Sequence, residues 1–173
     1  MSNRVVKVLS TPASHVYLVD AREVAAHLRV AESDTNYLNI IIANAQAVFT
    51  AQTNRVIGTF TYQYTLSGNK RTEIRLPYPP VHSITSVVNG NNNPVAYTLV
   101  NDNCLQTTNL HETLKIVFEA GYTLENVPLG VKMAILQYIA LLYTHRGDTA
   151  VEAEVYQSYL NAIAPYKIYN FWS

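Results

Sequence analysis

The chain has 173 residues, which is enough for one domain of ordinary size with a substantial core. Only 14% of its residues are charged and 49% are apolar, against about 25% charged in typical soluble domains, so we expect a partner to cover part of its surface. Twelve Lys and Arg residues balance twelve Asp and Glu residues. This neutrality excludes a strong overall attraction to nucleic acid or to an anionic membrane.

The chain carries one cysteine, Cys104, which cannot form an internal disulfide and lies among strand-like residues. This fits a reducing compartment and a structural role for the thiol. No apolar run of about 18 residues occurs, and the residues after Met1 do not form the apolar core of a signal peptide. We therefore expect a soluble protein that is made in the cytoplasm and has no membrane partner.

Two helices are predicted in the first third of the chain. Asp20 and Glu23 have the spacing of a capping box, so a short helix is expected to begin there and to end near Leu28. Ser33 and Asp34 offer the next helix start, and apolar residues recur at three- and four-residue spacing as far as about Arg55. These apolar positions are Leu38, Ile41, Ile42, Ala45, Val48 and Phe49.

The apolar period changes to two after Gly58, which predicts a strand with one aromatic face and one threonine-rich face. A return strand is expected over residues 73–76, and a further strand over residues 81–88. The proline-rich stretch 77–80 between them interrupts regular hydrogen bonding, which predicts a sheet edge or a crossover.

Turn chemistry is strongest in the stretch 89–94, because Asn and Gly tolerate positive φ. This stretch predicts a hairpin between strands at 83–88 and 95–100. Short strands at 104–107 and 113–119 are expected to complete one small antiparallel sheet.

A long helix is predicted after Pro128, which suits a first helical turn, and it should extend to about Arg146. Its apolar residues exceed the single stripe that a core-facing helix needs, so we expect it to be buried against more than its own domain, as in an assembly. A last helix is expected from Thr149 to about Ala162, and Pro165 should end it.

Together these elements predict an α+β fold, in which a four-helix arrangement is formed from both chain ends and a small antiparallel β domain is inserted between them. The expected divisions are an N-terminal arm with helices (1–56), the β insert (57–123), the C-terminal helices that complete the bundle (124–164), and an aromatic arm (165–173).

The residues that could carry chemistry are few and scattered. The five histidines, His15, His27, His82, His111 and His145, do not stand at metal-ligand spacing from one another or from the cysteine. Phosphate-binding glycine loops, dinucleotide fingerprints and nucleophile elbows are also missing from the sequence. We therefore expect no metal, no cofactor and no catalysis. His111 with Glu112 is a conceivable acid and base pair, but a solvated loop explains both residues more simply.

Aromatic residues gather near the C-terminus, and aromatic side chains with a polar tip are frequent at the centres of protein interfaces. The stretch 165–173 is therefore interpreted as a docking arm. Its candidate docking residues are Pro165, Tyr166, Lys167, Ile168, Tyr169, Phe171 and Trp172. The alternative, given equal weight, is that the arm folds back onto its own helices.

The order of these signals resembles a known family. The relevant pieces are Leu28-Arg29-Val30 before an acidic helix start, Thr53-Asn54-Arg55 at a helix end, Ile74-Arg75-Leu76-Pro77 with Pro80-Val81, Ala120-Gly121-Tyr122, Val127-Pro128, and Tyr143-Thr144-His145-Arg146. Over residues 20–147, this order is similar to that of the head-to-tail connector (adaptor) proteins of tailed bacteriophages and related gene transfer particles.

The resemblance implies a structural, non-enzymatic subunit of the virion neck. It implies a homo-oligomeric ring, typically of twelve copies, which docks below the portal protein, extends the DNA channel, and offers a platform to the tail or to a stopper protein. Terminal segments of the family reach the portal, which gives the aromatic arm a partner. DNA would pass through the lumen without specific binding, as a channel wall without net positive charge permits.

Closure of a ring requires one lateral face of a subunit to complement a different face of the next copy. The first half of the chain is mildly basic and the second half is acidic, so the predicted ring contacts are Arg22, Arg29, Glu152 and Glu154. Two other functions stay open at this point: a stopper or tail-completion protein of the same particle and, more distantly, a small hydrolase.

Overall fold

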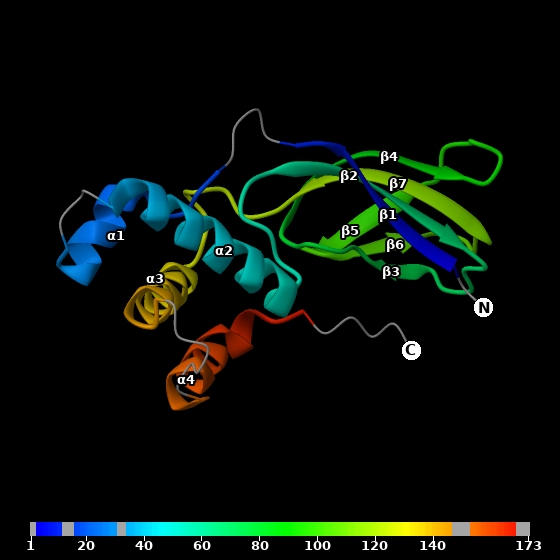
Figure 1. The fold of residues 1–173 in the computed structure, drawn as a ribbon. Helices are drawn as coiled ribbons and strands as arrows, with labels where there is room; N and C mark the ends of the chain where they lie inside the picture. Colours follow the sequence, from blue (N-terminus) through cyan, green and yellow to red (C-terminus); the bar gives the residue numbers. More distant parts are fainter. Residues whose placement is uncertain (1–2, 12–15, 31–33, 147–152, 169–173) are drawn as a thin grey trace. The chain divides into compact units, whose positions relative to one another are not determined.

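The structure is a computed structural model that describes residues 3–11, 16–30, 34–146 and 153–168. Among these residues it contains four α-helices and two antiparallel sheets, so the fold is of the mixed α+β type (Figure 1). The chain divides into two compact units. The β unit comprises residues 1–15 and 58–123, and the helical unit comprises residues 16–57 and 124–173.

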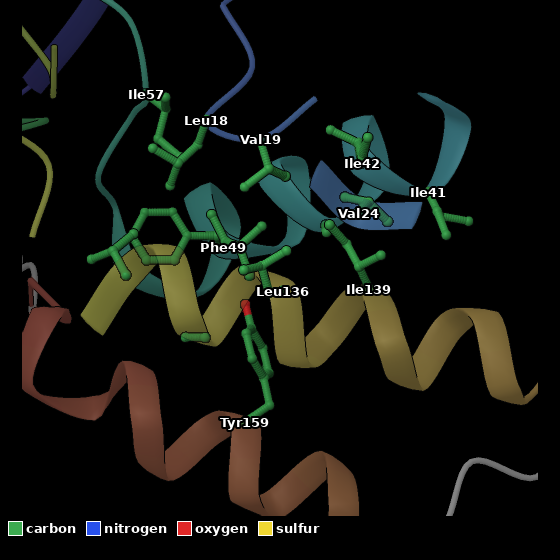
Figure 2. Close-up of a cluster of buried hydrophobic side chains, with 14 of the residues drawn as sticks. Leu18, Val19, Val24, Ile41, Ile42, Phe49, Ile57, Leu136, Ile139 and Tyr159 are labelled. Atoms are coloured by element: carbon green, nitrogen blue, oxygen red, sulfur yellow. The ribbon is translucent and has the colours of Figure 1, made fainter. Parts of the chain in front are cut away.

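The helical unit is built around one apolar core to which all four helices contribute (Figure 2). Its elements are α1 (Ala21–Leu28), α2 (Thr35–Thr53), α3 (Leu129–Thr144), α4 (Ala153–Ile163) and a 3₁₀ turn, η2 (Ala164–Tyr166). Val24 of α1, Phe49 of α2, Ile139 of α3 and Tyr159 of α4 are all fully buried in this core. The core therefore joins helices from before and after the β unit in the sequence.

Local signals fix the ends of the first two helices. The side chain of Asp20 accepts a hydrogen bond from the backbone nitrogen of Glu23 at 2.7 Å, which satisfies a free donor at the start of α1. Arg29 after α1 and Asn54 after α2 adopt the left-handed conformation, each with φ of 56°, and so end the helical hydrogen bonding. The two predicted helices are confirmed, and α2 starts after Asp34.

Helix α3 occupies the middle of the helical unit, because it packs against α1, α2 and α4. Its buried residues are Val131, Ala134, Ile135, Leu136, Ile139 and Leu141. A helix covered on several sides needs apolar residues around most of its circumference. The central position of this helix in its own unit accounts for much of its apolar excess, and its burial in an assembly stays a prediction.

The β unit contains seven strands in two sheets. The strands are β1 (Asn3–Ser10), β2 (Phe60–Ser67), β3 (Glu73–Arg75), β4 (Val81–Asn89), β5 (Tyr97–Asn101), β6 (Cys104–Thr107) and β7 (Thr113–Ala120). One sheet has the order β1-β2-β7-β4, and the other has the order β3-β6-β5. All the pairings are antiparallel.

The core of the β unit comes from alternate residues of the central strands. Tyr62 lies opposite Phe118 in the register of β2 and β7, and Tyr64 lies opposite Ile116, so these side chains share one face of the sheet. All four are buried, with Leu105 of β6 in the same cluster. The period-two pattern after Gly58 therefore predicted the strand and its buried aromatic face correctly.

Three predictions about strand pairing were wrong. The predicted single sheet is two sheets, and β3 pairs with β6 instead of returning along β2. The predicted hairpin of β4 with β5 is reduced to one bridge between Val88 and Pro94, after which β5 pairs with β6. The backbone nitrogen of Val95 still donates to the carbonyl oxygen of Val87 at 2.9 Å, after which the chain leaves β4.

The proline-rich stretch 77–80 carries the chain from β3 in one sheet to β4 in the other, so the predicted crossover is confirmed. Strand β1 was not predicted at all. Among the described residues, no helix is long and apolar enough to cross a membrane.

Candidate functional site

The described part of the chain offers little for metal binding or acid and base chemistry. In it, no group of three or more His, Cys, Asp and Glu side chains is placed to hold a metal ion. His111 and Glu112 lie in the turn before β7, where their carbonyl oxygens accept hydrogen bonds from Asn69, at 3.2 Å from its Nδ2 and at 2.9 Å from its backbone nitrogen, respectively. The backbone of this pair thus joins two neighbouring turns, and the structure supports the loop interpretation.

The remaining chemically interesting residues are also placed by structural contacts. His82 Nε2 lies 2.6 Å from the carbonyl oxygen of Gly121, and His145 follows the last residue of α3. Cys104 is buried in β6, where burial first, and then the neighbouring Glu73, raises the pKa of its thiol. A thiol that stays protonated at neutral pH is a poor nucleophile, which agrees with the structural role expected for it.

The first part of the predicted docking arm lies against the end of α2. The Nε of Arg55 donates a hydrogen bond to the carbonyl oxygen of Tyr166 at 2.8 Å. The backbone nitrogen of Ile168 donates to the carbonyl oxygen of Thr53 at 2.9 Å, and Nδ2 of Asn54 donates to the carbonyl oxygen of Ile168 at 3.0 Å. Three hydrogen bonds, made by Thr53, Asn54 and Arg55 at the end of α2, therefore hold this segment to its own helical unit.

The side chain of Tyr166 has a defined seat at the start of α3. It packs against the apolar core of the helical unit, and its hydroxyl lies so close to Gly130 that a Cβ at that position would collide with it. Gly130 therefore provides the space that the tyrosine ring requires.

The docking arm thus has two parts. Pro165, Tyr166, Lys167 and Ile168 follow α4 and belong to the helical unit, as the fold-back alternative described. Tyr169, Phe171 and Trp172 lie outside the described residues. The docking function of the arm as a whole stays a prediction.

The predicted ring contacts are only partly described. Arg22 in α1 is exposed, and Arg29 is exposed at the end of the same helix. Glu152 and the side chain of Glu154 lie outside the described part of the chain. The pairing of these four residues between copies therefore stays a prediction.

A cluster of three tyrosines joins α3 to α4. The rings of Tyr138 and Tyr159 are stacked with their centroids 4.6 Å apart, and Tyr156 lies 6.1 Å from each of them. Figure 2 shows the hydroxyl of Tyr159 pointing from α4 toward the apolar side chains of the core. That hydroxyl is buried and has no hydrogen-bond partner among the described residues, and burial raises the pKa of Tyr159.

Two strands of the β unit are exposed along their whole length, and both are rich in apolar residues. All eight residues of β1 are exposed, with Val5 at 52%, Val8 at 49% and Leu9 at 45% of their full accessibility. All five residues of β5 are exposed as well, with Val100 at 57%. Both strands lie at an edge of their sheet.

These two surfaces were missed by the sequence reasoning. The stretch Val5-Val6-Lys7-Val8-Leu9 is rich in β-branched residues, a signal for a strand that could have been recognised. Neither face of β1 is buried, so its residues do not alternate strictly between apolar and polar. The period-two pattern that usually predicts a strand is therefore absent. For β5, the expected hairpin placed the strand beside β4 and hid its position at the edge of a second sheet.

Comparison with known proteins gives likenesses in structure only. No protein-family model matches this sequence, and no curated protein matches it either. A chain from the neck of an empty gene transfer agent (GTA) particle, computed with C6 symmetry, is 19% identical, with 100% of this chain and 98% of that chain covered and a TM-score of 0.73. A chain from the virion of a native GTA particle is 18% identical, with 97% of both chains covered and a TM-score of 0.74.

A chain from the neck of the native GTA particle, computed with C12 symmetry, is 18% identical, with 100% of this chain and 98% of that chain covered and a TM-score of 0.64. At such identities the likeness establishes a shared fold. It extends over essentially the whole length of both chains, so both units take part in it.

Proposed function

We propose that this chain is a structural subunit of the neck of a phage-like particle. The observation that carries the proposal is the full-length likeness to a neck chain, which covers 100% of this chain and 98% of the other. Independent support comes from the sequence, in which the order of motifs over residues 20–147 resembles that of head-to-tail connector proteins. We place the mature protein in the virion, between the capsid portal and the tail.

Within the neck, we assign the chain to the adaptor (connector) position, as a ring below the portal. The solved necks were computed with C6 and C12 symmetry, which supports a ring of identical copies, and we propose a dodecamer. In this ring, helices from both sides of the β unit in sequence form the helical body of each subunit. The ring extends the DNA channel and offers a platform to the tail or to a stopper protein.

The proposed role needs no catalytic step. A conduit must let DNA pass without holding it, and each phosphate contact with Lys or Arg strengthens DNA binding. The chain has a formal net charge of zero, so its assembly forms no strongly basic wall by composition alone. We therefore propose no cofactor, no metal and no specific DNA site.

For portal docking we propose that the two parts of the arm have different roles. Residues 165–168 anchor the arm to the end of α2 through the three backbone and side-chain hydrogen bonds described above. Tyr169, Phe171 and Trp172 then supply the aromatic contacts to the portal. Aromatic side chains bury a large apolar area and are frequent among the residues that dominate binding energy.

Capture by the portal protein tests this proposal. The chain, mixed with its cognate portal protein, should co-migrate with it in size-exclusion chromatography. A Phe171→Ala/Trp172→Ala double variant should lose capture at an unchanged melting temperature. A matched Tyr166→Ala variant should instead lower the melting temperature, because it empties the seat beside Gly130. Indifference of the wild-type chain to the portal would contradict the adaptor assignment.

A stopper or tail-completion protein of the same neck is the alternative. The experiment above separates the two, because a stopper should bind the assembled adaptor ring and not the portal alone. A small hydrolase has no support in the described residues, where the His111 and Glu112 backbone joins two turns.

A further inference from the structure

Two strands of the β unit lie at sheet edges to which a further strand could be added. Strand β1 ends the sheet β1-β2-β7-β4, and β5 ends the sheet β3-β6-β5. An edge strand presents unpaired backbone donors and acceptors, and soluble proteins usually protect such an edge with charges, prolines or a covering element. Neither strand contains proline, and β1, which carries Arg4 and Lys7, also has four exposed apolar side chains, Val5, Val6, Val8 and Leu9.

In each sheet, the face that forms the core is left partly exposed at the edge strand. In the register of β1 and β2, Val6 lies opposite Tyr64 and Val8 opposite Tyr62, and both tyrosines are buried. Opposite residues of a ladder point to the same face, so the two valines extend the core face, yet they are 38% and 49% exposed. The core of the β unit therefore ends before β1.

Strand β5 shows the same feature in the other sheet. Leu99 lies opposite Leu105, which is fully buried, and is itself 38% exposed. Tyr97 lies opposite Thr107, which is 3% exposed, whereas Tyr97 is 40% exposed. Each sheet thus carries an apolar edge that its own unit leaves in solvent.

The two edges lie at different ends of the β unit. The Tyr97 hydroxyl at the start of β5 lies 3.4 Å from the carbonyl oxygen of Ile84 in β4, and Pro94 bridges to Val88 in the same strand. Strand β4 is the edge of its sheet opposite to β1. Two different patches at opposite edges cannot cover each other within one copy, but they suit a head-to-tail contact between copies, which closes into a ring when the rotation allows.

The charges of the two edges are complementary. Strand β1 contains Arg4 and Lys7 and no Asp or Glu, whereas β5 contains no charged residue and is followed directly by Asp102. Opposite charges on two different patches favour contact between them and disfavour contact of either patch with itself. A second copy of this chain is therefore the occupant that fits.

We infer that β1 of one subunit docks on the β5 edge of the next subunit and that this contact repeats around the ring. The inference rests on the proposed ring and names its lateral contact. Backbone pairing along an added strand supplies affinity, and the exposed valines and leucines of both strands supply the buried apolar area.

Disulfide trapping tests this contact on the full chain assembled with portal protein. We would compare the double variants Val6→Cys/Leu99→Cys and Val5→Cys/Val100→Cys with the four single variants, all in the presence of the buried native Cys104. After mild oxidation, at least one double variant should give a ladder of covalent multimers larger than a dimer on non-reducing gels. The single variants should stay monomeric, because position 6 of one copy would face β5 of the next. A Val6→Cys/Ile40→Cys pair, with an exposed partner on α2, serves as the matched control without a ladder.

The outcomes separate the inference from the proposed function. Mass photometry of the wild-type chain with portal protein first shows whether a ring forms at all, and its absence would overturn the proposed function. A ring without a ladder in either double variant would overturn the β1 and β5 contact alone. Dimers from a single β1 variant would also overturn it, because they would indicate a symmetric contact of β1 with itself, and a ladder from the Ile40 control would move the interface to the helical unit.

Discussion

The helical unit and the β unit bury their apolar residues to different extents. In the helical unit, even the unusually apolar α3 is covered by three neighbouring helices, and its exposed large apolar residues are Leu129 and Met133 near its start. In the β unit, two whole strands remain exposed with their valines and leucines. The comparison teaches that a high apolar content can be satisfied inside a subunit, so the need for a partner is shown by exposure and not by composition.

Removing a core side chain should have the largest effect on stability. Phe49→Ala deletes a fully buried ring in the helical core and should lower the free energy of unfolding by about 3 to 5 kcal/mol. Urea denaturation followed by circular dichroism measures this loss. The matched variant Ile40→Ala lies on the same helix at 66% exposure and should change stability by less than about 0.5 kcal/mol. Equal losses in the two variants would contradict the described core.

The seat of Tyr166 gives a sharper test of the anchored part of the arm. Gly130→Ala places a methyl group against the tyrosine hydroxyl and should cost about 1 kcal/mol, the low end of the overpacking penalty, because the tip of the half-buried ring can move. Addition of Tyr166→Phe removes the colliding oxygen and should recover part of the loss. If Gly130→Ala is stabilising instead, as expected for an open helix position, residues 165–168 do not pack as described.

Alkaline pH should weaken the core of the β unit. Burial, which the charge of Arg4 offsets in part, raises the pKa of Tyr64 from 10.0 to about 12. The unfolded chain therefore releases this proton at a lower pH than the folded chain, so stability is intact below pH 10 and falls as the pH rises toward 12. Denaturation midpoints between pH 9 and pH 12 should fall less steeply for Tyr64→Phe than for the wild type, and parallel curves would argue against burial of this hydroxyl.

The unpaired hydroxyl of Tyr159 should slightly lower the free energy of unfolding of the helical unit. Tyr159→Phe keeps the stacked ring and removes the buried oxygen, so it should raise the free energy of unfolding by about 1 kcal/mol. Chemical denaturation at neutral pH measures the gain. A loss of stability would indicate that the hydroxyl has a partner outside the described residues.

The exposed strand should show the smallest effect on the stability of the single subunit. Val5→Lys changes a residue of β1 that is 52% exposed and lies opposite Thr65, outside the buried core, and we expect a change below about 0.5 kcal/mol in the unassembled chain. The same variant should reduce ring formation with portal protein, as measured by mass photometry. Unchanged assembly would place the subunit contact elsewhere.

Much of the local structure could be predicted from the sequence, because local signals determine it. Asp20 marked the start of α1, and the alternation after Gly58 marked β2. Pairing partners could not be predicted in the same way, because register and sheet membership depend on contacts between distant residues. The turn at 89–94 is present, yet β5 belongs to a second sheet.

The candidate site was predicted less completely than the fold. The aromatic arm was recognised by its composition, but only the structure shows that Tyr166 is anchored beside Gly130. Strand β1 escaped prediction because a strand exposed on both faces has no burial pattern to detect. An exposed strand can thus be missed when only a buried face is searched for.

We have proposed that this chain forms a ring in the neck of a phage-like particle. Electron cryo-microscopy of particle necks that carry a labelled version of the chain tests it most directly. We expect label density in a twelvefold ring directly below the portal, with neighbouring β units in contact. Label at another part of the particle, or a single copy beside the portal, would contradict it.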